Sequence, residues 1–427
     1  MSNVFTLSGG IRRSRGVALL GLAILLAGAG GALNADDSAE TVRINTVATR
    51  YADYGYLSGS VLVAKHGRVI YERGFGEADR ERHVPNTPQT KFGIASLTKQ
   101  FTAVLVLQEV AEGQMRLDGK VSDYLSWYRK DTGAKMTVEQ LLRHTSGLPG
   151  DFDQPDFGDG KEAQKRRAPR EFSEEVCQKD LVNEPGTKWE YSNCGYDLLG
   201  LILESVSGKK FANLLHERLL EPIGMKDTGL EESGVLQPGE ARGYVRRAGP
   251  TYTRGPELDR LHLFSGGGMY STVEDLLRWN EALSEGGYVS GGIRQQIFKP
   301  GLHDWGYGWF VTKIPDGSPG AGNIMAEMRG DMPGNYFSWI LRYPEQDAVI
   351  IVLRNGYGST ENFEQNLQAV LFGGEPRMPS KSAKDIAAQL WIAPESWMES
   401  HPAVIAGTAI CATIAVWIVW RRRKIAT

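Results

Sequence analysis

Strand-like sequence occurs in two widely separated parts of this chain, with helix-like sequence between them. GSVLVAKHGRVIYERGFG (59–76) contains two β-rich runs around the turn KHGR, which predicts a hairpin. YFSWILRY (336–343) and AVIIVLRN (348–355) form a second such pair around PEQD, and WGYGWFVTKI (305–314) is also β-rich. We therefore expect one antiparallel sheet completed by segments from both ends of the folded domain.

The sequence between the two β-rich regions is mainly helical in pattern. Residues 96–113 are apolar almost all round, which predicts a helix buried on most sides. Between 114 and 260, helical patterns alternate with turn clusters, whereas 151–172 is charged, contains Gly and Pro, and has almost no aliphatic residues. We interpret 151–172 as a long surface loop that could act as a lid. The expected fold is α+β: an antiparallel sheet flanked by helices, plus an inserted, mainly helical subdomain.

The N-terminal segment has the pattern of an export signal. The basic residues RRSR (12–15) precede the apolar run VALLGLAILLAGAGGAL, and small residues follow as far as Ala35. A basic region, an apolar region and a small-residue cleavage zone predict a signal peptide over residues 1–35. An uncleaved N-terminal anchor is the alternative.

The C-terminal segment has the pattern of a membrane anchor. AVIAGTAICATIAVWIVW contains no charged residue and is followed directly by RRRK. As a helix, an 18-residue run spans about 27 Å, enough for the apolar core of a bilayer. We predict a transmembrane helix at 402–420, a cytoplasmic basic tail at 421–427 and a linker at 373–401. The folded domain, 40–372, would then lie outside the cytoplasm, in the periplasm or the extracellular space.

Charge and cysteine content exclude some partners. The net charge of −3 and the isoelectric point near 6.2 provide no broad basic surface for nucleic acid. Of the three cysteines, Cys411 falls in the predicted membrane segment. Cys177 and Cys194 could form a disulfide or remain two half-buried thiols. No Cys/His spacing predicts a metal site, and we expect no metal or organic cofactor.

The stretch FGIASLTKQFTA contains a candidate nucleophile and base. Ser96 is placed where a helix begins, so Lys99 lies one turn further on the same face. A lysine in a dry pocket has a lowered pKa and can accept the proton of a serine hydroxyl. The pair is weak evidence alone, because a helix start with an incidental lysine looks the same. A second S-x-x-K, Ser207 to Lys210, has the pattern of a helix end.

A second motif, EYSNCGYDLLG, gives the first pair its context. Serine β-lactamases and penicillin-binding proteins combine S-x-x-K with a polar triplet and a third motif on a strand. With Tyr191 and Asn193 in the triplet, the chain resembles the serine β-lactamase-related family, of the class C β-lactamase, D-alanyl-D-alanine carboxypeptidase and serine esterase type. LLRHTSGLPG, LLEPIGMKDTG and GGGMYSTVEDLLRW match the family in its order.

The resemblance implies a role for each matching residue. Ser96 would form an acyl-enzyme, Lys99 would accept its proton and Tyr191 would carry a proton to the leaving group. Asn193 would hold Lys99 and the substrate amide. The Ser96 N–H would form half of an oxyanion hole. His144 could act as a general base, but in the HTSGL segment it is expected to support a turn beside the site.

The third motif departs from the family pattern. Counting back from the Pro-Gly turn in AEMRGDMPGNYFSW places Met328, Arg329 and Gly330 at the motif, and Asp331 would supply the second oxyanion N–H. The family usually has Lys or His where this chain has Met328, a position that helps to bind a substrate carboxylate. Arg329 is grouped with the substrate-supporting residues, although neighbouring strand residues face opposite ways and it does not simply replace that cation.

These features predict a membrane-tethered serine hydrolase outside the cytoplasm that acts on an ester, amide or peptide through an acyl-enzyme. Its substrate would be a small molecule or a peptide, with the cell wall as one source. Esterase or D-amino-acid peptidase activity is favoured over efficient β-lactam hydrolysis. The sequence has no G-x-S-x-G and no H-E-x-x-H, which disfavours an α/β-hydrolase and a zinc hydrolase. The alternative is a weakly active or inactive binding protein at the cell surface.

Overall fold

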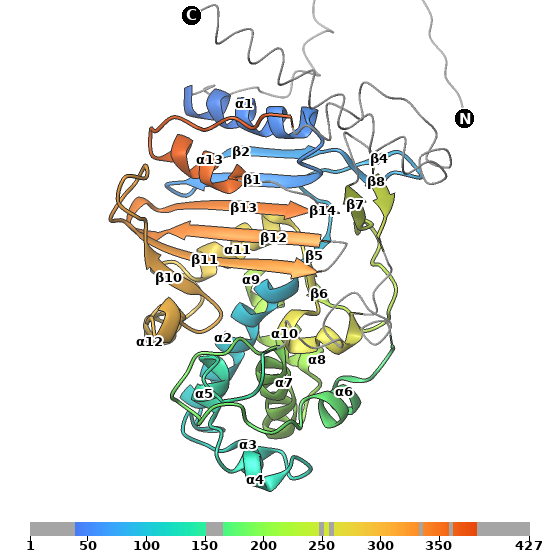
Figure 1. Cartoon of the computed structure of the whole chain (residues 1–427), viewed down its shortest axis with the longest axis vertical. Helices are drawn as coiled ribbons and strands as arrows, with labels where there is room; N and C mark the ends of the chain where they lie inside the picture. The colour runs from blue at the N-terminus through green and yellow to red at the C-terminus, as the bar shows by residue number, and fades with distance from the viewer. Residues whose placement is uncertain are drawn as a thin grey trace, which may run out of the picture. The chain divides into compact units, whose positions relative to one another are not determined.

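The computed structural model describes the chain between residues 39 and 381, with five gaps (Figure 1). The predicted signal peptide and transmembrane helix lie outside the described residues, as do residues 151–164. Among the residues that are described, no helix is long and apolar enough to cross a membrane. The described ranges are 39–150, 165–246, 252–255, 260–332, 336–357 and 362–381.

A six-stranded antiparallel sheet joins the two ends of the domain. Its strand order is β10-β11-β12-β13-β1-β2, so the early hairpin pairs directly with the late strands (Figure 1). The register between β1 and β13 runs from Gly59 opposite Arg354 to Lys65 opposite Ala348. The expected sheet and both hairpins are confirmed. The strands are β1 (Gly59–Lys65), β2 (Arg68–Phe75), β10 (Phe310–Lys313), β11 (Ile324–Met332), β12 (Tyr336–Tyr343) and β13 (Ala348–Arg354).

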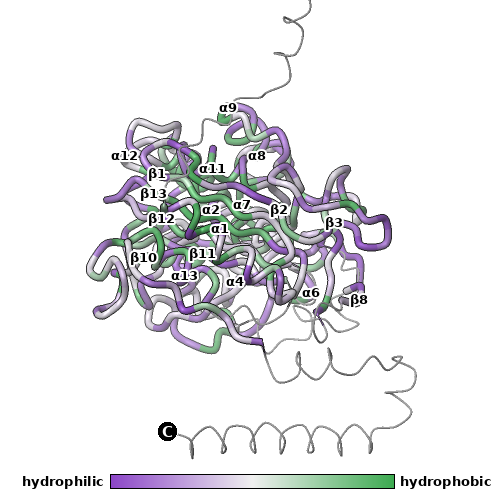
Figure 2. Tube along the Cα trace, turned by 90° about the horizontal axis from the view of Figure 1, so that it is seen from above, coloured by the Kyte–Doolittle hydropathy of each residue, from purple (hydrophilic) through white to green (hydrophobic). Residues whose placement is uncertain are grey.

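Helices cover both faces of this sheet. α1 (Ala39–Asp53) and α13 (Phe363–Leu371) pack on one face. On the other face, α11 (Val273–Ala282) contacts the central strands, and α2 (Thr98–Ala111) joins the same apolar cluster. Every residue of β13 is buried, as expected of a strand that is covered on both sides and is apolar throughout. The tube is coloured as hydrophobic along parts of β1, β13 and α2 (Figure 2), and most residues of these elements are buried.

The remaining helices form the mainly helical part of the domain, away from the sheet (Figure 1). These are α3 (Val121–Tyr124), α4 (Lys130–Gly133), α5 (Val138–Leu142), α6 (Pro169–Val176), α7 (Asn193–Ser207), α8 (Phe211–Leu215), α9 (Glu221–Ile223), α10 (Phe264–Gly267) and α12 (Gly291–Ile297). Single turns are η1 (Ala95–Leu97), η2 (His216–Leu220), η3 (Leu261–Leu263), η4 (Leu302–Asp304) and η5 (Pro344–Gln346).

Short strands connect the two parts of the domain. Two of their sheets have three strands, β5-β9-β6, which lies beside η1, and β14-β7-β8, and β3-β4 has two. Their bounds are β3 (Glu77–Asp79), β4 (Val84–Pro85), β5 (Phe92–Gly93), β6 (Gly229–Leu230), β7 (Tyr244–Arg246), β8 (Tyr252–Arg254), β9 (Met269–Ser271) and β14 (Gly356–Tyr357).

The structure differs from the sequence-based expectation in two segments. The last residues of the predicted loop 151–172 are helical, not loop, because Pro169 begins α6, and Phe172 is fully buried rather than on the surface. Pro fits this position because the first helical N–H needs no partner. In the β-rich run 305–314, only the four residues of β10 form a strand.

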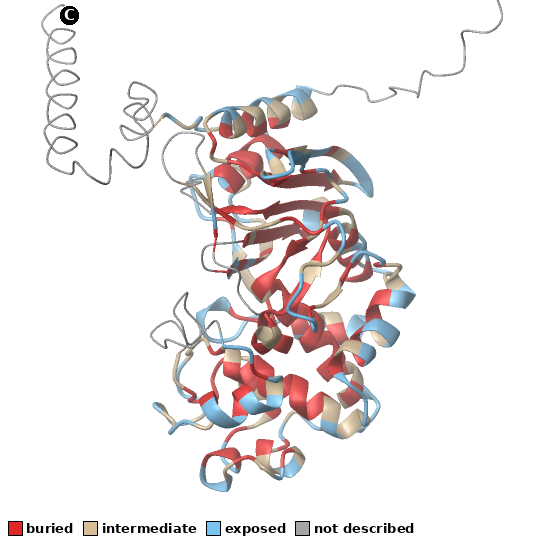
Figure 3. Ribbon diagram, turned by 90° about the vertical axis from the view of Figure 1, so that its right-hand side faces the viewer, coloured by how far each residue is buried: buried red, intermediate tan, exposed pale blue. Residues whose placement is uncertain are grey.

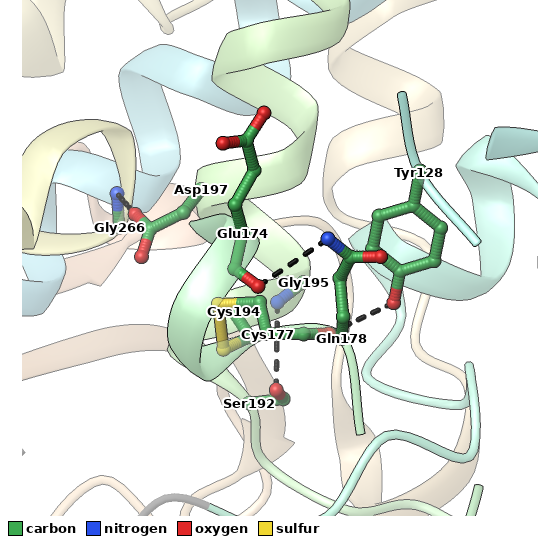
Figure 4. Close-up of a disulfide and its surroundings, with 9 residues drawn as sticks. All are labelled: Tyr128, Glu174, Cys177, Gln178, Ser192, Cys194, Gly195, Asp197 and Gly266. Atoms are coloured by element: carbon green, nitrogen blue, oxygen red, sulfur yellow. Dashed lines mark hydrogen bonds between the residues drawn. A yellow bond between two sulfur atoms is a disulfide. The ribbon is translucent and has the colours of Figure 1, made fainter. Parts of the chain in front are cut away.

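The structure resolves whether the two cysteines outside the predicted membrane segment pair, since Cys177 and Cys194 form a disulfide (Figure 4).

Buried residues gather along α2, α7 and the central strands (Figure 3). α2 is buried on most sides, as predicted, and even Lys99 and Gln100 on this helix are fully buried. Phe101 stacks on Trp279 of α11 with ring centroids 4.1 Å apart. This stack joins α2 to the helix that covers the sheet.

We expect Phe101→Ala to destabilise the domain strongly. Removing a buried Phe side chain leaves a cavity and typically costs about 3–5 kcal/mol of unfolding free energy. The control is Val42→Ala on the exposed side of α1, where the side chain is 51% exposed and little should change. Denaturant unfolding of both variants checks this, and equal midpoints for the two would contradict it.

Candidate active site

Ser96 lies in η1, the single turn that leads into α2. The preceding residue, Ala95, has φ of 46°, a conformation that costs energy for a residue with a Cβ atom. Thr98 Oγ1 donates to the Ala95 carbonyl at 2.7 Å, and Ser338 Oγ of β12 donates to the Ile94 carbonyl at 2.7 Å. These two hydrogen bonds hold the strained backbone that presents Ser96.

Lys99 supplies the buried amine of the site, with no exposed surface. Its Nζ lies 3.3 Å from Ser96 Oγ, 2.5 Å from Asn193 Oδ1 and 2.6 Å from the Gly266 carbonyl oxygen. These three oxygens belong to neutral groups, and they come from η1, α7 and α10. The structure thus places the predicted base against the predicted nucleophile.

Tyr191 completes the group around the serine. Its hydroxyl oxygen lies 2.7 Å from Ser96 Oγ, and its ring centroid is 4.9 Å from Lys99 Nζ. Ser192 next to it is the N-cap of α7 and accepts a hydrogen bond from the Gly195 N–H at 3.4 Å. Asn193 is the first residue of α7, so the cap and the helix start present Tyr191 and Asn193 to the site.

His144 packs against the segment that contains Tyr191 and Ser192. Its Nδ1 accepts a hydrogen bond from the Ser192 N–H at 3.1 Å, and its ring lies 4.4 Å from that of Tyr191. Burial, together with the nearby charge of Lys99, holds the pKa of His144 well below its usual value of 6.5. His144 is therefore neutral, and the structure gives it the loop-supporting position expected from the sequence. It contacts the ring of Tyr191 but not Ser96.

β11 lies against the nucleophile turn at Gly330. A Cβ atom on Gly330 would lie 2.3 Å from the Ile94 carbonyl oxygen and 3.0 Å from Ala95 Cβ, so only glycine allows this approach. Met328 is 2% exposed on the same face, in the apolar cluster that contains Ala95. Asp331 is exposed, and its side chain faces away from Ala95 because strand residues alternate.

The structure does not bring Arg329 into the site. Its side chain points to the opposite face of the sheet, where it lies 4.3 Å over the ring of Trp339. Trp339 belongs to the apolar cluster beneath α1 and α13. The grouping of Arg329 with the substrate-supporting residues is therefore corrected: strand alternation directs this cation away from Ser96.

Two residues of the site were not recognised from the sequence. The Gly266 carbonyl accepts from Lys99, and Asp197 Oδ1 accepts from the Gly266 N–H at 3.1 Å. The GGGM run was seen only as a family match, and its backbone role has no side-chain signature. The second S-x-x-K is a helix end, since Ser207 is the last residue of α7 and Lys210 is exposed.

This arrangement can activate a hydroxyl. A neutral amine has two hydrogens and one lone pair. When Asn193 Oδ1 and the Gly266 carbonyl accept the two hydrogens of Lys99, the lone pair remains for the proton of Ser96. The described residues contain no group of three or more His, Cys, Asp or Glu that could hold a metal ion.

Comparison with known proteins identifies the family. A family model described as beta-lactamase matches residues 44–375, most of the chain. The chain belongs to the β-lactamase family. The family resemblance inferred from the motifs is confirmed, and so is the α+β fold with its antiparallel sheet and helices.

Individual relatives agree with this assignment. Protein Flp of Staphylococcus aureus (strain MW2) is 28% identical over 327 residues, which are 73% of this chain and 62% of that protein. The chain thus spans less than two thirds of that relative. The penicillin-binding protein of Bacillus halodurans is 28% identical, with a TM-score of 0.66 over 75% of this chain and 98% of that one. The D-amino acid amidase of Ochrobactrum anthropi SV3, solved with D-phenylalanine, is 25% identical, with a TM-score of 0.65 and coverage of 78% and 98%.

We expect His144 to make folding stability depend on pH. Its pKa is lowered in the folded state, so below pH 6.5 the unfolded chain binds a proton that the folded chain does not. The unfolding free energy should then fall by about 1.4 kcal/mol for each unit of pH decrease, until the folded-state pKa is reached. His144→Asn should remove this contribution, so the stability difference from wild type should shrink as the pH falls from 6.5.

Denaturant unfolding between pH 5 and 8 measures this difference. His216→Asn provides a control at an exposed histidine in η2. Parallel stability profiles for wild type and His144→Asn would show that His144 does not stay neutral in the fold.

Proposed function

We propose that this protein is a serine hydrolase that cleaves uncharged esters and amides, peptides included, through an acyl-enzyme on Ser96. The observation that carries this is the position of Lys99 Nζ, fully buried and within hydrogen-bonding reach of Ser96 Oγ, Asn193 Oδ1 and the Gly266 carbonyl. An uncompensated ammonium is costly to bury, and this placement suits a lysine that works as a base.

The proposed reaction has two steps. Ser96 Oγ attacks the carbonyl carbon while its proton passes to Lys99 Nζ, and the carbonyl π electrons move to the oxygen. The resulting oxyanion is expected to bind the N–H groups of Ser96 and Asp331. As it collapses, the bond to the leaving group breaks, Tyr191 delivers a proton to that group, and the proton held by Lys99 passes to Tyr191, so that both side chains are restored. Water then attacks the acyl-enzyme by the same route and regenerates Ser96.

The face of β11 toward the site restricts the proposed substrates. Met328 and Gly330 point toward the cluster around Ala95, and neither can pair with a carboxylate. Arg329 points to the other face of the sheet. β-Lactams and peptides that end in a free carboxylate should therefore be poor substrates. Esters and amides without a charge at that position lose nothing, and the similarity to a D-amino acid amidase supports the amide class.

The location of this activity is also part of the proposal. The apolar terminal segments support an extracytoplasmic domain anchored by residues 402–420. The Cys177–Cys194 disulfide is consistent with an oxidising compartment. A small-molecule or peptide substrate derived from the cell wall would be reached from there.

A binding protein without turnover is the second candidate, and Met328 favours it because the usual cation is missing. Lys99 opposes it. Binding alone gives no reason to keep an amine in a fully buried position against Ser96 Oγ. We therefore favour catalysis.

Labelling by a fluorophosphonate tests the proposed nucleophile. We expect one adduct per chain on Ser96, lost in Ser96→Ala and strongly reduced in Lys99→Ala, because only an activated hydroxyl reacts quickly with this probe. Intact mass and peptide mapping of the full chain measure the adduct. Ester turnover should fall by about 10³-fold or more in Ser96→Ala. A folded wild type with no adduct would favour the binding protein.

Met328→Lys tests the proposed substrate restriction. A cation on this face of β11 should increase acylation by a penicillin about 10-fold or more relative to turnover of a neutral ester, since it can pair with the β-lactam carboxylate. Met328→Leu keeps the apolar volume and controls for packing. Acylation rates are read by mass spectrometry. If Lys and Leu have the same effect, residue 328 does not select against carboxylates.

A further inference from the structure

We propose that the Cys177–Cys194 disulfide positions the proton acceptor Lys99, so that the hydrolase is fully active only in its oxidised form. This inference rests on the proposed function and adds a redox requirement to it. The disulfide lies beside the first turn of α7, which supplies the surroundings of Lys99 (Figure 4).

Two of the oxygens that contact Lys99 Nζ are linked to the start of α7, between Asn193 and Asp197. Asn193 Oδ1 lies 2.5 Å from Lys99 Nζ directly. The Gly266 carbonyl, at 2.6 Å, belongs to a residue whose N–H donates to Asp197 Oδ1 at 3.1 Å. Asn193 and Asp197 are four residues apart and share one face of the helix. A shift of this turn would therefore move both acceptors.

Cys194 lies between these two residues and ties the turn to α6. The N-cap bond from Gly195 N–H to Ser192 Oγ, which also holds the helix start, is long at 3.4 Å. The Ser192 N–H bond to His144 Nδ1 at 3.1 Å and the Tyr196 hydroxyl bond to the Leu142 carbonyl at 2.9 Å are further restraints, and none of these is covalent. The disulfide joins Cys194 covalently to Cys177, with Cα atoms 5.3 Å apart. Both cysteines are buried, so the link lies within the packed core.

The α6 end of the disulfide is itself held firmly. The Cys177 carbonyl accepts from the Tyr128 hydroxyl at 2.8 Å (Figure 4). The next residue, Gln178, accepts from the Arg129 N–H at 3.1 Å through its side chain and donates to the Glu174 carbonyl at 3.3 Å. Hydrogen bonds thus hold Cys177 in place, and the disulfide restrains the start of α7 relative to it.

The redox chemistry is that of thiol–disulfide exchange. In formation, an external disulfide takes two electrons from the pair. One cysteine thiolate attacks it, forms a mixed disulfide and releases one external thiol; the second cysteine thiolate then attacks the mixed disulfide and displaces the other external thiol, and the two cysteine protons end on these two thiols. A dithiol reverses this, leaves two cysteine thiols and becomes a cyclic disulfide itself. A chain kept reduced by cytoplasmic thiols would have a loosened site. The hydrolase would then gain its activity on oxidation.

The test compares three variants of the full chain with oxidised wild type. Cys177→Ala/Cys194→Ala removes the link. Leu203→Ala truncates a fully buried side chain further along α7 and lowers stability without touching its first turn. Asn193→Ala removes one acceptor of Lys99 and serves as the reference for a displaced first turn. Circular dichroism and denaturant unfolding establish which variants are folded and how stable they are.

The readouts are kcat, KM and the pH–rate profile for a neutral ester. We expect kcat of the double-cysteine variant to fall about 10- to 100-fold with little change in KM, the effect of misplacing a catalytic group by about 1 Å. The acid limb should move to lower pH, as in Asn193→Ala, because a lost acceptor leaves the ammonium form of Lys99 less stabilised. The titratable groups around Lys99 include Tyr191, Tyr196 and His144, which none of these variants changes.

Reduction of wild type by a dithiol gives a second measurement without substitution. Activity should fall in proportion to the two thiols that appear per chain, and recover on reoxidation. Wild-type kcat in the folded double variant would overturn the inference. So would an equal loss of kcat and an equal shift of the acid limb in Leu203→Ala, since stability alone would then explain the effect. An oxidised wild type without ester turnover would overturn the proposed function, and this inference with it.

Discussion

The burial of one amine organises much of this domain. Lys99 has no exposed surface, and desolvating an ammonium without partners is costly. The oxygens around its Nζ come from η1, α7 and α10, which are far apart in the sequence. α10 reaches this position only because Gly200 of α7 has no side chain: a Cβ there would lie 2.0 Å from Ser265 Oγ. The packing of α2, α7 and α10 is therefore inseparable from the solvation of Lys99.

Strands of the large sheet help to fix the position of Ser96, as the helices fix that of the Lys99 amine. Ala95 has a strained φ of 46°, which persists only where the surroundings fix it. β11 and β12 provide part of this restraint, because Gly330 lies against Ile94 and Ser338 Oγ donates to the Ile94 carbonyl. β1 then joins β13 in the same sheet. The position of Ser96, the proposed nucleophile, therefore depends on strands from both ends of the domain, which no local segment could supply.

The sequence predicts this fold in the segments where the spacing of apolar residues and the residue types favour the same secondary structure. The hairpin at 59–76 and the late strands were predicted from β-rich runs around turns, and residue spacing placed Ser96 and Lys99 on one helix face. The sequence could not show contacts made by the backbone, such as the Gly266 carbonyl, since these have no side-chain signature. α6 was missed in part because its start lies in a charged, Gly- and Pro-bearing segment.

The free-energy cost of burying Lys99 also bears on whether the site is catalytic or only binds a ligand. A domain that only binds a ligand would gain stability from an apolar residue at position 99, because a buried cation with neutral partners is more costly than a packed side chain. The cation of the third motif has been replaced by buried, apolar Met328. Lys99 is still buried against Ser96, and Tyr191 still lies 2.7 Å from Ser96 Oγ. The side chains that would act on the carbonyl in the proposed reaction are thus all present, and the missing cation would affect which substrates bind. That combination fits a hydrolase of neutral substrates better than an idle scaffold.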